Sequence, residues 1–131
     1  MRNNQDKILY KELSYKINGI LFKVRKELGR YKNEKQYCDA IEEELKKSGI
    51  KHEREKIIEN PVEGNFFRSK VDFLIEDVIV LEIKAKSFVT NEDYFQARRY
   101  LTDLDLKLGI IANMRQYNVL PKRIINSEKP E

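Results

Sequence analysis

The residues that could do chemistry gather in Val71–Lys86, which reads VDFLIEDVIVLEIKAK. Two apolar runs in this stretch carry Asp72 on the first and Glu82 with Lys84 on the second. Alternate side chains of a β-strand share a face, so Glu82 and Lys84 point the same way and Ile83 points to the other side. Two carboxylates and a lysine on one face are groups that metal-dependent phosphodiester hydrolysis would use.

That chemistry requires an activated water and stabilisation of a highly charged phosphorus centre. Asp72 and Glu82 together could hold a divalent cation that lowers the pKa of its bound water, with the carbonyl of Ile83 as a further ligand. Lys84 could orient the water or stabilise charge on the phosphate. The chain has one cysteine and one histidine, which excludes a zinc site built on several such residues. Carboxylate ligands favour Mg²⁺ or Mn²⁺.

Whether Asp72 joins this face depends on the loop between the two strands. A two-residue turn would pair Asp72 with Leu81 and leave it on the opposite face from Glu82. A three-residue loop, Glu76–Val78, pairs Ile75 with Ile79 and Asp72 with Glu82, and we predict this loop. Two directly opposed carboxylates repel each other, and a cation between them removes that cost.

The Glu-x-Lys spacing alone is not diagnostic, because Glu44-Leu45-Lys46 repeats it. That copy lies on a predicted helix, where positions two apart diverge. For Glu82 and Lys84, the alternative is a salt-bridged pair on an exposed sheet face. The apolar neighbours instead predict a sheet buried on both sides, where charges need partners or a metal.

Hydrophobic spacing predicts the elements that position these residues. We expect the order helix, helix, strand, strand, strand, helix, strand in one domain over residues 1–131, with a small central mixed sheet between helices. Asn33 should cap the second helix and Asn91 the third, whose buried side would include Phe95. The predicted ranges are a basic helix from about Tyr10 to Leu28, a helix ending at Gly49, strands over 50–58, Phe66–Ile75 and Val78–Lys86, a helix to about Asp103, a strand over Lys107–Asn113, and a tail, Met114–Glu131, that docks through Ile124-Ile125.

The net charge of +4 is unevenly distributed. Residues 1–32 hold nine Lys or Arg against three acidic residues, a net charge of +6, and the remainder is −2. A basic segment beside a carboxylate-rich body suits nucleic acid, with a solvated helix face as the alternative. The tyrosines Tyr10, Tyr15 and Tyr31 could stack on bases or pack amphipathically. The candidate phosphate contacts are Lys16, Lys23, Arg25, Arg30, Arg98 and Arg99.

No secretory signal and no apolar run long enough to cross a bilayer is found in the sequence. We therefore predict a soluble, cytoplasmic protein without membrane partners.

The chain resembles the PD-(D/E)XK nuclease superfamily, in particular its small GxxExxR family, over about residues 15–113. Lys23 stands where that family carries an acidic residue, and Arg30-Tyr31 where it carries Pro and Gly. The matching segments are Glu27-Leu28-Gly29, Glu34 with Tyr37 and Glu44-Leu45, Ser48-Gly49-Ile50, Val71-Asp72-Phe73-Leu74, Glu82-Ile83-Lys84-Ala85, Gln96 with Tyr100-Leu101, and Lys107-Leu108-Gly109 with Asn113.

The resemblance implies an α/β, restriction-endonuclease-like fold with a three-layer α/β/α core. It implies that Asp72, Glu82 and Lys84 are the catalytic core. Glu34 would be the carboxylate from the helix before the sheet, and Gln96 the polar residue from the helix after it. Glu34 shares a stripe with Tyr37 and should face inward, although it could simply favour the helix start, and Glu44 is the other candidate for the helical carboxylate.

We therefore expect a Mg²⁺- or Mn²⁺-dependent nuclease, acting on DNA more than on RNA. The alternatives are a catalytically silent nucleic-acid-binding module and an interaction subunit of a defence or repair system. A homodimer or a protein partner could supply specificity.

Overall fold

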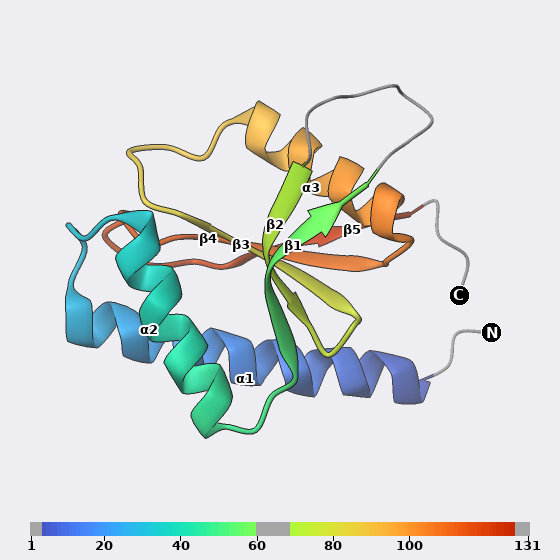
Figure 1. Cartoon of the computed structure of the whole chain (residues 1–131), viewed down its shortest axis with the longest axis horizontal. Coiled ribbons are helices and arrows are strands. Elements are labelled where there is room, and N and C mark those ends of the chain that lie inside the picture. Colours follow the sequence, from blue (N-terminus) through green and yellow to red (C-terminus); the bar gives the residue numbers. More distant parts are fainter. Residues whose placement is uncertain (1–3, 60–68, 128–131) are drawn as a thin grey trace.

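The computed structural model describes residues 4–59 and 69–127 (Figure 1). Among residues 4–59 and 69–127, no helix is both long and apolar enough to cross a membrane. The elements formed by these residues are α1 (Asn4–Leu28), α2 (Glu34–Lys47), β1 (His52–Ile58), β2 (Ser69–Ile75), β3 (Ile79–Lys84), α3 (Asn91–Leu104), β4 (Leu108–Asn113) and β5 (Lys122–Ile125).

The five strands form one mixed sheet in the order β1-β2-β3-β4-β5. Neighbouring strands are antiparallel except β3 and β4, which are parallel and are connected through α3. Helices α1 and α2 cover one face of the sheet and α3 covers the other (Figure 1). The expected restriction-endonuclease-like α/β fold is confirmed.

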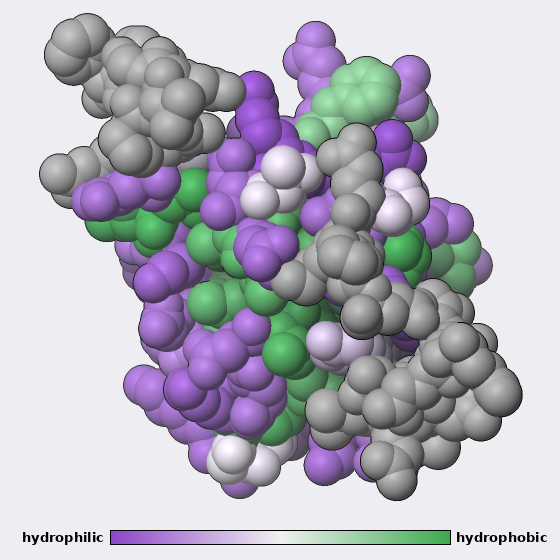
Figure 2. Space-filling model, turned by 90° about the vertical axis from the view of Figure 1, so that its right-hand side faces the viewer, coloured by the Kyte–Doolittle hydropathy of each residue, from purple (hydrophilic) through white to green (hydrophobic). Residues whose placement is uncertain are grey.

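Strand alternation divides the core between the two faces of the sheet. Toward α1 and α2, the buried side chains of β3 are Ile79, Leu81 and Ile83, which belong to the same cluster as Leu21 of α1. Toward α3, Val80 packs with Leu101. Even-numbered residues of β3 therefore face α3, and this parity also places Glu82 and Lys84 on the α3 face. Seen from the right-hand side of Figure 1, hydrophobic residues reach the surface in the middle of the molecule, beside hydrophilic ones (Figure 2).

The β2–β3 hairpin has the three-residue loop predicted from strand parity. Ile75 pairs with Ile79, and the register continues through Phe73 and Leu81. Glu76 and Asp77 adopt φ of 51° and 59°, in the left-handed region of a tight turn. Helix α1 is followed by Gly29, whose φ of 77° lies in the same left-handed region and suits the end of a helix.

Several predicted boundaries are wrong. Helix α1 begins at Asn4, before the predicted Tyr10. Thr90, not Asn91, caps α3, because the Thr90 side chain accepts a hydrogen bond from the Asp93 N–H. Phe95 is exposed, since it lies two residues before buried Ala97 and so on nearly the opposite side of the helix.

The C-terminal tail was expected only to dock. Instead it forms β5, which pairs with β4 and covers an edge that would otherwise present unpaired backbone groups. Ile124 is buried and Ile125 is exposed, because the two side chains of a strand point to opposite faces. Residues 66–68 of the second predicted strand and residues 128–131 of the predicted tail lie outside the described residues.

Candidate active site

Asp72 and Glu82 face each other where the backbone ladder between β2 and β3 stops. The last regular pair is Phe73 with Leu81. Beyond it, Asp72 Oδ2 accepts a hydrogen bond from the Ile83 N–H at 2.7 Å, and Glu82 Oε1 accepts one from the Asp72 N–H at 3.2 Å. The two carboxylates therefore replace backbone carbonyls as hydrogen-bond acceptors, which fixes both side chains to the strands.

The neighbouring strand is irregular at the same level. The β1–β2 ladder pairs Arg54 with Phe73 and Lys56 with Val71, but omits the pair between them. The omitted residue of β1 is Glu55, which has a φ of 54°. A left-handed non-glycine residue within a strand is uncommon, and this one lies opposite Asp72.

Burial and mutual repulsion disfavour the charged form of this pair. Glu82 is only 5% exposed. Desolvation first and the charge of Asp72 second raise the pKa of Glu82 to about 8, while Lys84 acts in the opposite direction. Desolvation also raises the pKa of Asp72, against the Ile83 hydrogen bond and the charge of Lys84.

The donor set of this pair fits a hard divalent cation. Among residues 4–59 and 69–127, no group of three or more His, Cys, Asp or Glu side chains is arranged to hold a metal ion. Asp72 and Glu82 would be two carboxylate ligands of such an ion. Mg²⁺ commonly takes one or two carboxylates and completes its shell with water and substrate phosphate. A cation between the two carboxylates would also offset the repulsion that raises their pKa values.

Lys84 lies between two acidic side chains. Its Nζ is 4.0 Å from Glu82 Oε2 and 3.9 Å from Asp93 Oδ1, and its side chain is mostly buried. Both separations exceed a hydrogen-bond length. The Lys84 ammonium group therefore lies near Glu82 through charge attraction and forms no hydrogen bond with Glu82 or Asp93.

Asp93 is the residue of this cluster that sequence reasoning missed. It lies in the first turn of α3, where its carboxylate accepts hydrogen bonds from the Thr90 N–H at 2.8 Å and from Lys86 Nζ at 2.5 Å. Burial opposes ionisation, but the bonds from Lys86 and Thr90 outweigh it and lower the pKa of Asp93. The Thr90-x-x-Asp93 capping-box pattern was the signal that could have identified it.

Glu34 and Gln96 lie near this cluster on different helices. Glu34, the first residue of α2, is exposed, so the expectation that its side chain faces the core is wrong. Partial desolvation first and the charge of Asp72 second raise its pKa, which places it within electrostatic reach of the pair. Gln96 lies with Asp93 in the lining of a hollow of about 400 Å³ beside α3.

Glu44, the other candidate for the helical carboxylate, is engaged elsewhere. It is buried. Its carboxylate lies 3.0 Å from Lys23 Nζ and 3.6 Å from Lys47 Nζ. The hydrogen bond from Lys23 lowers the pKa of Glu44 despite its burial. Its charge is thus neutralised locally.

The predicted phosphate contacts do not form a single surface. Lys16 is exposed on α1, and Arg98 and Arg99 are exposed on α3, across the sheet (Figure 1). Lys23 is paired with Glu44. The remaining two contact the loop after β4: Arg25 donates to the carbonyls of residues 116 and 117, and Arg30 donates to that of residue 115.

Comparison with known proteins agrees with this geometry. Searches of curated proteins and of solved structures find no match. The family model described as the PD-(D/E)XK nuclease superfamily matches residues 11–124, from α1 into β5. The match includes the Asp72–Glu82 pair and Lys84. The chain therefore belongs to the PD-(D/E)XK nuclease superfamily.

Proposed function

We propose that this chain is a metal-dependent nuclease that hydrolyses phosphodiester bonds, of DNA more readily than of RNA. The observation that carries the proposal is the buried Asp72–Glu82 pair with Lys84 beside it. Two carboxyl groups held together away from water cost stability when both are ionised, and strongly shifted pKa values of this kind cluster at functional sites. Membership in a nuclease superfamily supports the same conclusion.

In this proposal, Asp72 and Glu82 bind Mg²⁺ or Mn²⁺, with the carbonyl of Ile83 as a further ligand. The bound cation would supply a Lewis acid and a water of lowered pKa. Lys84 orients the attacking water or stabilises negative charge on the phosphate. Glu34, on α2, would reach the cation directly or through a water molecule. Gln96, on α3, would be a further polar residue of the site.

Substrate would be held by lysine and arginine side chains, through phosphate contacts that carry no sequence information. We propose further that the chain forms one domain over residues 1–131, that it belongs to the GxxExxR family, and that it acts in the cytoplasm. A homodimer or a protein partner would supply specificity. The proposed phosphate contacts are Lys16, Lys23, Arg25, Arg30, Arg98 and Arg99.

The direct test is cleavage of labelled single-stranded, duplex and branched DNA and of RNA, with Mg²⁺, with Mn²⁺ and with EDTA. Lys84→Ala should strongly reduce a metal-dependent activity of the wild type. Lys46→Ala is the matched control, because Lys46 occupies the same position in the second Glu-x-Lys copy but is exposed on α2. Equal inactivity of wild type and Lys84→Ala on every substrate would refute the enzymatic role.

The alternative, a silent binding module, makes a different prediction in the same samples. Binding would fall steeply with salt. It would not depend on the metal, and Asp72→Asn would leave it unchanged.

A further inference from the structure

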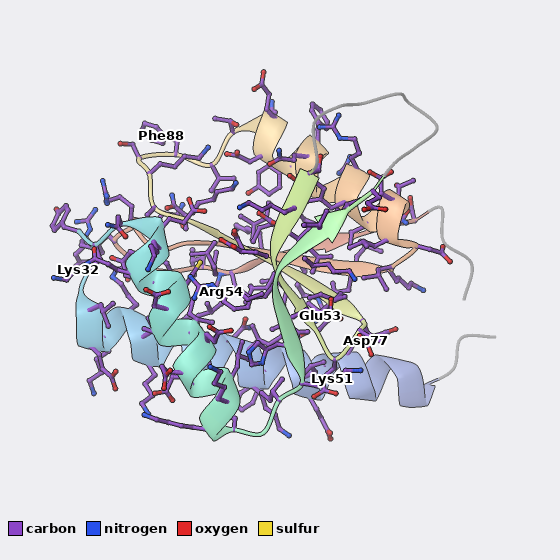
Figure 3. The ribbon with its side chains drawn as sticks, viewed as in Figure 1. Lys32, Lys51, Glu53, Arg54, Asp77 and Phe88 are labelled. Atoms are coloured by element: carbon purple, nitrogen blue, oxygen red, sulfur yellow. The ribbon has the colours of Figure 1, made fainter. Side chains whose placement is uncertain are left out.

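Three loops meet at the edge of the sheet where β3 and β4 end. They are residues 29–33 between α1 and α2, residues 85–90 between β3 and α3, and residues 114–121 between β4 and β5. Figure 3 shows Lys32 and Phe88 at this end of the molecule, whereas Lys51 and Asp77 lie at the opposite end. Buried Asn113 links two of these loops, since its side chain donates to the Lys86 carbonyl and accepts from the Arg115 N–H.

Each of these loops presents a large aromatic side chain to solvent. Tyr31 is 75% exposed, Phe88 78% and Tyr117 79%. All three line one hollow of about 540 Å³. Single exposed apolar residues are ordinary, but three aromatic rings around one hollow indicate a binding surface. We call these three residues, with Arg30 and Arg115, the aromatic–arginine surface.

The two arginines are held in place without a carboxylate. Arg30 Nε donates to the Arg115 carbonyl at 3.1 Å, and Arg115 Nε donates to the Arg30 carbonyl at 2.9 Å. The Arg30 guanidinium carbon lies 5.2 Å from the ring centre of Tyr31 and 5.7 Å from that of Tyr117. Within residues 4–59 and 69–127, neither arginine forms an ion pair with an acidic side chain, so their charges are available to an anion.

The charge around the hollow is of one sign. Its lining contains Arg30 and Arg115 and no acidic residue. A second hollow of about 510 Å³ shares Tyr117 with the first, adds Arg25 and Lys26, and also contains no acidic residue. The lining of the two hollows is therefore both cationic and aromatic. This composition suits a ligand in which phosphate groups alternate with flat aromatic groups.

The aromatic–arginine surface adjoins the candidate active site. The Met114 N–H donates to the Lys84 carbonyl at 2.8 Å, and Asn113 is the β4 residue paired with Lys84. Arg115 follows two residues later along the chain. A polymer lying on this surface would thus pass close to Lys84.

We propose that the aromatic–arginine surface binds the unstacked bases and phosphates of single-stranded nucleic acid, so that the substrate is a single strand or a junction with a single-stranded arm. This inference rests on the nuclease function proposed above. Aromatic side chains and arginine planes stack on exposed bases of any sequence. In a duplex the base faces are already stacked on each other, so a surface of this kind discriminates against duplex.

Binding is measured in EDTA by fluorescence anisotropy, with single strands of about 12 nucleotides of dT or rU and with a duplex of the same length. Comparing dT with rU separates DNA from RNA. Tyrosine emission gives a second readout of stacking, because the chain contains no tryptophan. Tyr31→Ala and Tyr117→Ala should each weaken single-strand binding by about 5- to 100-fold and affect duplex binding little. Tyr117→Phe keeps the ring and should retain binding.

The matched control is Tyr15→Ala, because Tyr15 is 80% exposed on α1 but lines neither hollow. If an alanine variant does not fold, Tyr117→Leu removes the aromatic face while keeping apolar bulk. The inference is overturned if duplex binds as tightly as single strands, or if Tyr15→Ala weakens binding as much as Tyr117→Ala. It is also overturned if Tyr117→Ala changes only the oligomeric mass, which would identify a self-association surface.

Because binding is measured without a divalent cation, its outcome is independent of turnover. Single-strand binding without cleavage would refute the nuclease function and retain the surface. Cleavage unaffected by Tyr31→Ala and Tyr117→Ala would refute the surface and retain the nuclease.

Discussion

Replacing Glu82 by glutamine should stabilise the metal-free protein. Burial and the charge of Asp72 raise the pKa of Glu82 from its ordinary 4.5 to about 8. A carboxyl group with a raised folded-state pKa contributes stability that is fully present below the unfolded pKa and is lost as the pH rises through the folded pKa. Glu82→Gln keeps the size and the acceptor oxygen but cannot ionise, so the variant avoids this loss.

The magnitude follows from the same two pKa values. Between pH 5 and pH 8, a carboxyl with these values loses about 3 kcal/mol of folding free energy. Because Glu82 is almost fully buried, solvent screening reduces this figure little. For a chain of this length, about 3 kcal/mol corresponds to roughly 10 °C in Tm. We therefore expect the metal-free variant to melt well above wild type at pH 8 and close to it at pH 5.

The assay is thermal and urea unfolding at pH 5, 7 and 8, with EDTA and with Mg²⁺. Saturating Mg²⁺ at about 100 times its Kd should stabilise wild type by about 2.7 kcal/mol, and it should stabilise Glu82→Gln much less. Glu44→Gln is the matched control. Glu44 is a buried carboxylate too, but its ion pair with Lys23 lowers its pKa. Loss of the Glu44 charge should therefore destabilise the protein at neutral pH, the opposite sign to Glu82→Gln.

Three results would contradict this reasoning. Glu82→Gln could be less stable than wild type at pH 8 in EDTA, or it could follow Glu44→Gln in sign and pH dependence. Mg²⁺ could also stabilise wild type and Glu82→Gln equally, which would show that the cation binds elsewhere.

Three further substitutions test other parts of the structure. Lys84→Ala should lower metal-dependent cleavage by about 10²- to 10³-fold without changing Mg²⁺ affinity in titration calorimetry, whereas a full loss of Mg²⁺ binding would assign Lys84 a different role. Asp93→Asn should lower turnover by about 10-fold with unchanged substrate affinity, because Lys84 and Lys86 lose a shared partner; unchanged steady-state rates would show that Asp93 serves only as a helix cap. Leu101→Ala removes a fully buried side chain that packs over Gly109 and should cost about 2–5 kcal/mol in urea unfolding, and a smaller loss would mean that the α3 interface relaxes.

Features that depend on local spacing could be predicted from the sequence. The β2–β3 hairpin is the main example, because its register follows from a period of two and from the length of one loop. That register brings Asp72 to Glu82, and the resemblance located Glu34 near them. The helix caps were less predictable. Asn33 caps α2 as expected. The cap of α3 is Thr90 and not the predicted Asn91, because the Thr90 side chain reaches the Asp93 N–H.

Contacts between distant segments could not be predicted in this way. Glu44 and Lys23 lie 21 residues apart, and their ion pair depends on how α1 docks beside α2. The reciprocal bonds between Arg30 and Arg115 join positions 85 residues apart, through loops placed by the ends of α1 and β4.

The sequence by itself therefore determined which residues share a hairpin face, since strand alternation and loop length are properties of consecutive residues. Only the tertiary structure decided which other charges surround that face. Asp93 joins Lys84 and Lys86 because the crossover helix α3 returns over the sheet. Glu44 does not take part, because its carboxylate forms an ion pair with Lys23 of α1. Docking of helices is decided by burial summed over many side chains, and no local spacing encodes that sum.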